Sequence, residues 1–102
     1  MRYLGGISGR GALMSNGVKI GRASYDFEGF FQHPIGVTSC GELRLAFPAL
    51  KTVFGRTDVQ LLTDDGHLLD LRFSYWESPP TRGVAHVDVT GDLPATPQNW
   101  HH

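Results

Sequence analysis

The chain is poor in cysteine, so its stability has to come from its own hydrophobic core. Only one of its 102 residues is a cysteine, Cys40, so no disulfide can form within it, and the cysteine density of a small secreted scaffold is missing. With 40% hydrophobic residues the chain can instead fill one compact core. This composition predicts a single small domain in a reducing cytoplasm.

The sequence also lacks an excess of charge of one sign and long apolar runs. Nine Lys and Arg residues against ten Asp and Glu residues give a net charge of -1, which creates no field that would attract nucleic acid or an anionic membrane. No apolar stretch approaches the ~20 residues that cross a bilayer, and residues 1–6 lack the apolar region of a signal peptide. We therefore expect neither export nor a membrane partner.

Familiar catalytic and metal-binding motifs are also missing. The sequence contains no Gly-x-Ser-x-Gly nucleophile elbow and no EF-hand spacing, so Asp64-Asp65-Gly66 is interpreted as a hairpin turn and not as a calcium loop. The sequence thus predicts a non-enzymatic protein without a cofactor.

The chain does contain an internal repeat. Three short segments recur in the same order at an offset of 49 to 50 residues, namely 13–17 with 62–66, 22–25 with 72–75, and 41–43 with 91–93. Such matches predict two related units of three strands each, at about residues 7–46 and 57–94.

Turn and alternation signals define the strands within these units. Asn16-Gly17 supplies the two positive φ angles of a type I′ turn after a first strand at residues 7–14. The returning strand changes parity, because Val18 and Ile20 alternate out of phase with the residues that follow, so we expect a bulge near Gly21-Arg22 that keeps both sets inward. The other inward positions are predicted to be Ala23, Tyr25, Phe27, Leu43, Leu45, Val59, Leu61, Thr63, Leu69, Leu71, Phe73, Tyr75, Ala85, Val87 and Val89.

One segment between the two units has a helical period. Phe47, Leu50 and Phe54 are spaced as on one face of a helix, Pro48 suits its first turn and Gly55 suits its end. We predict a short helix at residues 47–55 whose three apolar side chains close an open end of the sheet structure.

The predicted fold is all-β. Two three-strand meanders joined by a short helix are expected to close into a six-stranded antiparallel barrel, because closure removes both exposed sheet edges. A two-layer β-sandwich is the alternative. The domain covers residues 1–94, and residues 95–102 are predicted to be a flexible tail, with Trp100 able to fold back onto an apolar patch.

Two resemblances accompany this pattern. An Asn/Asp-Gly hairpin in each half, with Gly41-Glu42-Leu43 and its counterpart at 91–93, resembles uncharacterised small bacterial β-barrel proteins, which implies the fold but no activity. The segment 38–43 is similar to the Asp-x-Ser-x-x-Gly segment of the c-di-GMP-binding PilZ barrel. That family also carries Arg-x-x-x-Arg, and neither Arg2 nor Arg10 has an arginine four residues on, so this likeness concerns the fold alone.

Aromatic residues are the leading candidates for a functional surface. Strand alternation predicts that Trp76 and one of Phe30 and Phe31 point outward, and Trp100 lies in the tail. Clustered exposed aromatics mark contact surfaces, although the tail or the helix could cover them within one chain. We interpret the protein as a binding or assembly module whose partner is another protein or a second copy.

An alternative function uses basic side chains. Arg22, Arg44 and Arg72 are predicted to point outward from strands, and a row of arginines beside aromatics is how oligonucleotide-binding barrels hold single strands. Because Asp and Glu residues occupy neighbouring outward positions, cross-strand ion pairs are the favoured interpretation and nucleic acid is a disfavoured partner.

Metal, nucleophile and pocket chemistry are weaker candidates. His86 and Asp88 share one strand face, but a metal would need a third ligand such as His67 or Asp70. Cys40 would need a nearby histidine such as His33 to act as a nucleophile. A small ligand or nucleotide could enter the barrel mouth under the predicted helix, yet a six-stranded barrel is expected to be filled by its own side chains.

Overall fold

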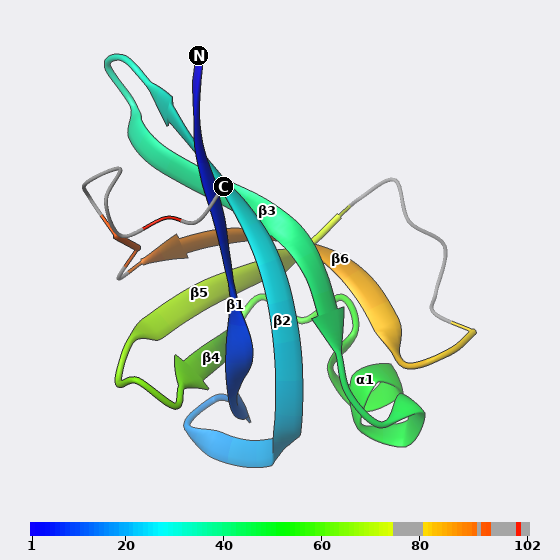
Figure 1. Cartoon of the computed structure of the whole chain (residues 1–102). Helices are drawn as coiled ribbons and strands as arrows, with labels where there is room; N and C mark the ends of the chain where they lie inside the picture. Colours follow the sequence, from blue (N-terminus) through cyan, green and yellow to red (C-terminus); the bar gives the residue numbers. More distant parts are fainter. Residues whose placement is uncertain (75–80, 92, 95–99, 101–102) are drawn as a thin grey trace.

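The computed structural model describes residues 1–74, 81–91, 93–94 and 100 (Figure 1). Its elements, in chain order, are β1 (Arg2–Ser15), β2 (Val18–Gln32), β3 (Gly36–Arg44), α1 (Phe47–Val53), β4 (Val59–Thr63), β5 (Leu68–Phe73) and β6 (Val84–Gly91). The strands form a closed barrel in the order β1-β2-β3-β6-β5-β4. All neighbouring strands are antiparallel. The predicted six-stranded barrel with one short helix is confirmed, and the sandwich alternative is wrong.

Alternating side chains from all six strands fill the barrel. Phe27, Leu43, Leu61 and Val87 are each 0% exposed and belong to one hydrophobic core cluster. From Ala23 onward, the described residues that were predicted to point inward are buried, except for Leu45 and Phe73, which are half-buried against the same core, as Ile20 is. The period-two pattern therefore identified the core, because each strand has one face inside.

The bulge in β2 lies one residue before the predicted place. Leu13 pairs with Gly21 and Met14 with Lys19, so Ile20 is the extra residue. The bulge turns Ala23, Tyr25 and Phe27 inward as expected, but it doesn't turn the residues before it inward as well. Val18 is 61% exposed, because it sits at the hairpin tip beyond the barrel wall. Its predicted inward orientation is wrong.

Helix α1 closes one end of the barrel, and of the three side chains predicted to do so only Leu50 is fully buried. Leu50 and Val53 are 0% exposed, whereas Phe47 is 38% exposed. Phe54 follows the helix and contacts Phe73, with ring centroids 5.1 Å apart. A helix of seven residues presents barely two turns, so only one inward row reaches the core. No helix in the described part of the chain is long and apolar enough to cross a membrane.

Polar contacts fasten the segment after the helix to the end of β1. Ser15 is 2% exposed and donates a hydrogen bond to Oδ1 of Asp58 at 2.9 Å. The same hydroxyl oxygen accepts a hydrogen bond from Nη1 of Arg56 at 3.1 Å. The buried hydroxyl is thus fully used, which removes the cost of burying it.

The first of the three sequence matches joins positions of opposite orientation. Leu13 is 0% exposed and its proposed counterpart Leu62 is 43% exposed. The last buried residue before each turn is Ser15 in the first unit and Thr63 in the second. The match aligns Ser15 with position 64, so burial and the match differ by one position. The first turn has positive φ at Asn16 and Gly17, and the second turn is longer. Duplication of the two units stays a prediction.

The first two strands are much longer than the rest and extend beyond the barrel. They have 14 and 15 residues, against five and six in β4 and β5. Their far ends pair with each other and with the start of β3, and Figure 1 shows this ribbon projecting past the other strands. We call residues 2–6 and 28–38 the arm. The first strand begins at Arg2, five residues before the predicted start.

The inward row of α1 should control stability. We expect Leu50→Ala to lower the free energy of unfolding by about 2–5 kcal/mol, because it leaves a cavity where a fully buried side chain was. The matched control Phe47→Ala, on the exposed side of the same helix, should cost about 1 kcal/mol or less. Urea denaturation followed by circular dichroism measures both, and equal losses would contradict the orientation of the helix.

Candidate functional site

The arm carries several exposed apolar side chains. Phe31 is 41% exposed, and Ile35 in the β2–β3 turn is 67% exposed. Phe30 is half-buried on the opposite face, where its ring contacts that of Tyr3 at a centroid distance of 5.5 Å. Tyr3 was missed because it precedes the predicted start of the first strand, and Ile35 because it lies in a turn beside Pro34. Of the predicted aromatic set, the structure thus places Phe30 and Phe31 on the arm.

The other two predicted aromatics don't join this surface. Trp100 is 3% exposed, and its indole Nε1 donates a hydrogen bond to the carbonyl of Pro94 at 3.0 Å. Its ring lies on Gly29 of the arm, where a Cβ would come within 2.5 Å of the indole. Trp100 as an exposed contact residue is therefore wrong, because it folds back within the chain. Trp76 and, apart from Trp100, the predicted flexible tail 95–102 lie outside the described residues.

Beside the arm, β1 has a stretch of backbone without a second partner among the described strands, which is buried at Leu4 and Gly5 and exposed at Ser8 and Gly9. It pairs with β2 along nearly its whole length but with β4 only from Gly11 to Ser15. Among the described strands, none pairs with this second side of β1 from Leu4 to Gly9. The stretch from Leu4 to Gly9 contains no charged residue and no proline. Sequence reasoning missed this edge because a closed barrel was expected to have none.

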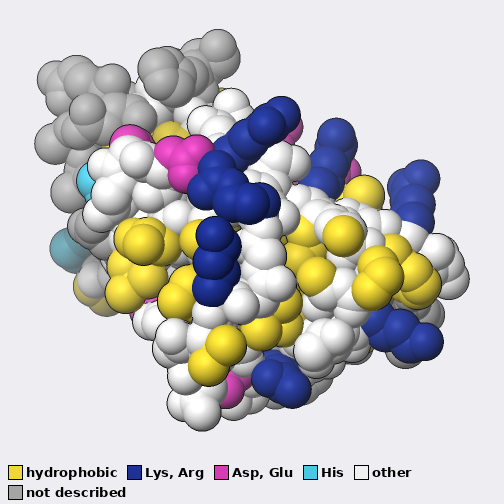
Figure 2. All heavy atoms as spheres, turned by 90° about the horizontal axis from the view of Figure 1, so that it is seen from below, with side chains coloured by type: hydrophobic (Ala, Val, Ile, Leu, Met, Phe, Trp, Pro, Cys, Tyr) yellow, Lys and Arg dark blue, Asp and Glu magenta, His cyan; other side chains and the backbone are white. Residues whose placement is uncertain are grey.

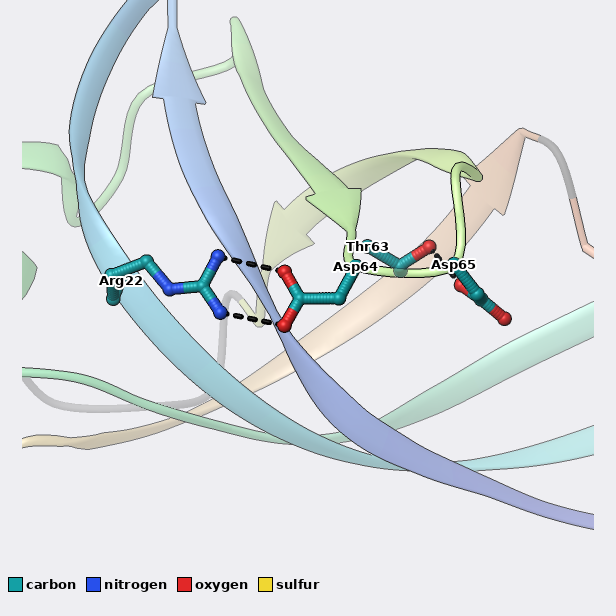
Figure 3. Close-up of polar contacts among 4 residues, drawn as sticks. All are labelled: Arg22, Thr63, Asp64 and Asp65. Atoms are coloured by element: carbon teal, nitrogen blue, oxygen red, sulfur yellow. Dashed lines mark hydrogen bonds and ion pairs between the residues drawn. The ribbon is translucent and has the colours of Figure 1, made fainter.

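The three predicted outward arginines are exposed, but they form no common stripe. Arg22 donates two hydrogen bonds to the carboxylate of Asp64, at 2.7 and 2.6 Å (Figure 3). Arg44 is paired with Glu42 at 2.5 Å. Arg72 lies on β5, opposite Asp88 of β6, and β6 separates it from β3, which carries Arg44. Figure 2 shows Lys and Arg side chains spread among hydrophobic ones at the lower end of the barrel.

These ion pairs are local electrostatic contacts of a mixed-charge surface. Hydrogen bonds from Arg22, with its positive charge, lower the pKa of Asp64, and the Asp64 carboxylate in turn raises the pKa of Arg22. Both side chains are more than half exposed, so solvent screens the attraction. With two of three guanidinium groups occupied by carboxylates, the predicted arginine face doesn't form a groove that follows a nucleic acid backbone.

Cys40, His86 and Asp88 do come together on the outer wall. Cys40 pairs across the strands with Asp88, and His86 is two residues away on the same strand, opposite Glu42. Burial, followed by the charges of Asp88 and Glu28, raises the pKa of the Cys40 thiol. A nucleophilic cysteine needs the opposite shift, so this cluster keeps the thiol protonated.

The remaining candidate ligands and bases don't converge. His33 lies in the turn beyond the Gln32 and Gly36 pair, at the tip of the arm, while Cys40 pairs with Glu28 four residues down β2. Within residues 1–74, 81–91, 93–94 and 100, no group of three His, Cys, Asp or Glu residues could hold a metal. The region 64–67 is a hairpin turn, in which the Thr63 hydroxyl donates a hydrogen bond to Asp65 (Figure 3). The same hydroxyl oxygen accepts a hydrogen bond from the backbone N–H of His67 at 2.9 Å.

No protein-family model, no curated protein and no solved structure matches this chain significantly.

The contact between Trp100 and the arm can be tested at Gly29. We expect Gly29→Ala to displace the indole, so that the Trp100 Nε1–H loses protection against hydrogen exchange measured by NMR. The control is Gly21→Ala on the same strand, where an added Cβ meets nothing within 4 Å. Unchanged protection in Gly29→Ala would contradict the packing; comparison with Trp76→Phe assigns the two indole signals.

The Arg22 pair predicts a pH dependence. Because the native pKa of Asp64 lies below its ordinary value of 3.8, the pair stabilises the fold above that pH and loses its effect as the pH falls through the native pKa. In Arg22→Gln the Asp64 pKa should rise toward 3.8 in an NMR titration of the carboxyl carbon. Arg44→Gln is the control and should leave Asp64 unchanged; a shift of equal size there would refute the assignment.

Proposed function

We propose that this protein is a non-enzymatic assembly module that binds a second copy of itself through the β1 edge and the arm. The observation that supports the proposal is the half-buried to exposed stretch from Gly6 to Gly9, which has no second strand partner among the described strands. It offers backbone donors and acceptors without any charge or proline to obstruct them. Strand addition at such an edge gives affinity through main-chain hydrogen bonds.

A second copy is the occupant that fits this edge. Two β1 strands that pair antiparallel about a twofold axis at Ser8 would place Ser8 opposite its own copy and Ile7 opposite Gly9. Such an interface uses the same surface on both subunits and brings no like charges opposite each other. Proteins that avoid edge pairing guard their edges with lysine, proline or bulges. In β1 a bulge lies at Leu4, whereas residues 6–9 are small or apolar and pair with β2 in unbroken register.

The arm supplies apolar area next to the edge. Phe31 and Ile35 are exposed on the arm, and Met1, which directly precedes it, is 85% exposed. Apolar side chains at the centre of an interface contribute most of its binding energy, while backbone pairing sets the orientation. The single cysteine fits a module that works in a reducing cytoplasm.

A charge on the edge should abolish self-association. Ser8 is exposed and lies directly across from Asp26 of β2, so Ser8→Lys gains a carboxylate neighbour and should remain folded. We expect light scattering to give a dimer for the wild type and a monomer for Ser8→Lys at the same concentration, because the two lysines would face each other across the twofold axis.

The control is Thr90→Lys, an exposed position on β6 that pairs with Asp70 of β5; β6 lies between β3 and β5 in the barrel and is not an edge strand. This variant should remain dimeric, and circular dichroism should show all variants folded. Phe31→Ser should weaken the dimer without abolishing it, since it removes apolar area from the arm but leaves the edge intact. A monomeric wild type would refute self-assembly.

A further inference from the structure

A groove of about 430 Å³ lies on the outer wall of the barrel, away from the β1 edge. It runs between the segment that follows α1 and the last residues of β5. Its lining combines aromatic rings, two guanidinium groups, hydroxyls and one carboxylate: Phe54, Gly55, Arg56, Thr57, Arg72, Phe73, Ser74 and Asp88. This volume falls within the range of small-molecule sites.

The aromatic part of the groove is a tilted pair of rings. Phe54 and Phe73 have ring centroids 5.1 Å apart and ring planes inclined at 54°. Both side chains are half-buried, so the core holds them in place while part of each ring stays accessible. Such a pair offers a face and an edge against which a planar apolar ring can pack.

The cationic part comes from two different elements. Arg56 is held through Nη1 by the buried Ser15 hydroxyl, which fixes one end of its guanidinium group. Arg72 projects from β5 and also lines a neighbouring groove of about 490 Å³. A guanidinium group presents paired N–H donors that match the oxygens of a phosphate or a carboxylate.

The charges of the lining favour an anion. Among the residues that line the groove, two arginines stand against the single carboxylate of Asp88, which is an excess of one positive charge. Asp58 lies outside this lining, where its carboxylate accepts a hydrogen bond from Ser15. The hydroxyls of Thr57 and Ser74 add neutral hydrogen-bonding groups. We propose that this groove binds a small organic anion in which a planar apolar ring is joined to a phosphate or a carboxylate.

The proposal differs from self-assembly in place and in chemistry. The groove belongs to β5, β6 and the segment after α1, whereas the dimer edge belongs to β1. The Ser8→Lys variant should therefore bind the ligand as the wild type does, and failure of either proposal leaves the other intact.

Adenosine monophosphate is the probe for the test, and adenosine and inorganic phosphate are its two halves. Isothermal titration calorimetry measures affinity, and backbone NMR shifts of residues 54–57 and 72–74 locate the site. We expect adenosine monophosphate to bind more tightly than either half. Indole-3-acetate is the carboxylate probe, and the tighter of the two intact probes identifies the preferred anionic group.

Two variants should move the affinity in opposite directions. Arg72→Gln should weaken binding of adenosine monophosphate about tenfold, as expected for loss of a charged hydrogen-bond donor. Asp88→Asn should strengthen it about threefold, because it removes the one negative charge beside the anion. Arg82→Gln changes an exposed arginine outside the groove and should leave the affinity unchanged.

Several results would overturn the proposal. If neither intact probe shifts the groove residues at millimolar concentration, the groove isn't a site for such anions. If adenosine binds as tightly as its monophosphate, the arginines don't recognise the anion; if phosphate alone does, the rings don't contribute. Equal weakening by Arg72→Gln and Arg82→Gln would show nonspecific attraction by charge. Unchanged affinity in Asp88→Asn would exclude the groove as the place of binding.

Discussion

The short pairing between β1 and β4 is the interaction on which the rest of the structure depends. Five residue pairs, from Gly11 with Thr63 to Ser15 with Val59, join the two ends of the sheet and close the barrel. The backbone N–H of Asp64 adds a hydrogen bond to the carbonyl of Arg10 at 2.9 Å just past this pairing. Closure of the sheet encloses the core, so the hydrophobic contribution of that core depends on these few residues.

The same pairing explains why one edge remains open. β4 has five residues and β1 has 14, so a single short strand can't cover the long one. On the N-terminal side of Gly11 the first strand therefore keeps only β2 as its strand partner in the described part of the chain. The mismatch in strand length converts a closed barrel into one with a projecting arm, and this is the physical basis for the self-assembly that we propose.

Sequence patterns located individual residues well where only local geometry mattered. Period-two alternation found Leu61, Leu71 and Val89 in the core, and Asn16-Gly17 found the first hairpin turn. The pattern was less reliable where two elements compete for one space. Helical spacing selected Phe47, Leu50 and Phe54, but of these only Leu50 is fully buried, together with Val53, because the packing direction of a short helix is set by what it covers.

The class of fold, the number of strands, the main turns and most of the inward residues could be predicted from the pattern of residues, because they follow from the period of the backbone and from φ angles that few residues adopt. Which charges neutralise each other depends instead on how the strands pair in the closed barrel. Arg22 and Asp64 are 42 positions apart in the chain, yet they form a bidentate pair. The tertiary structure likewise buries Trp100 against Gly29 and brings Arg56 and Arg72 into the lining of one groove. Such contacts depend on strand lengths and on closure, which alternation along one strand doesn't encode.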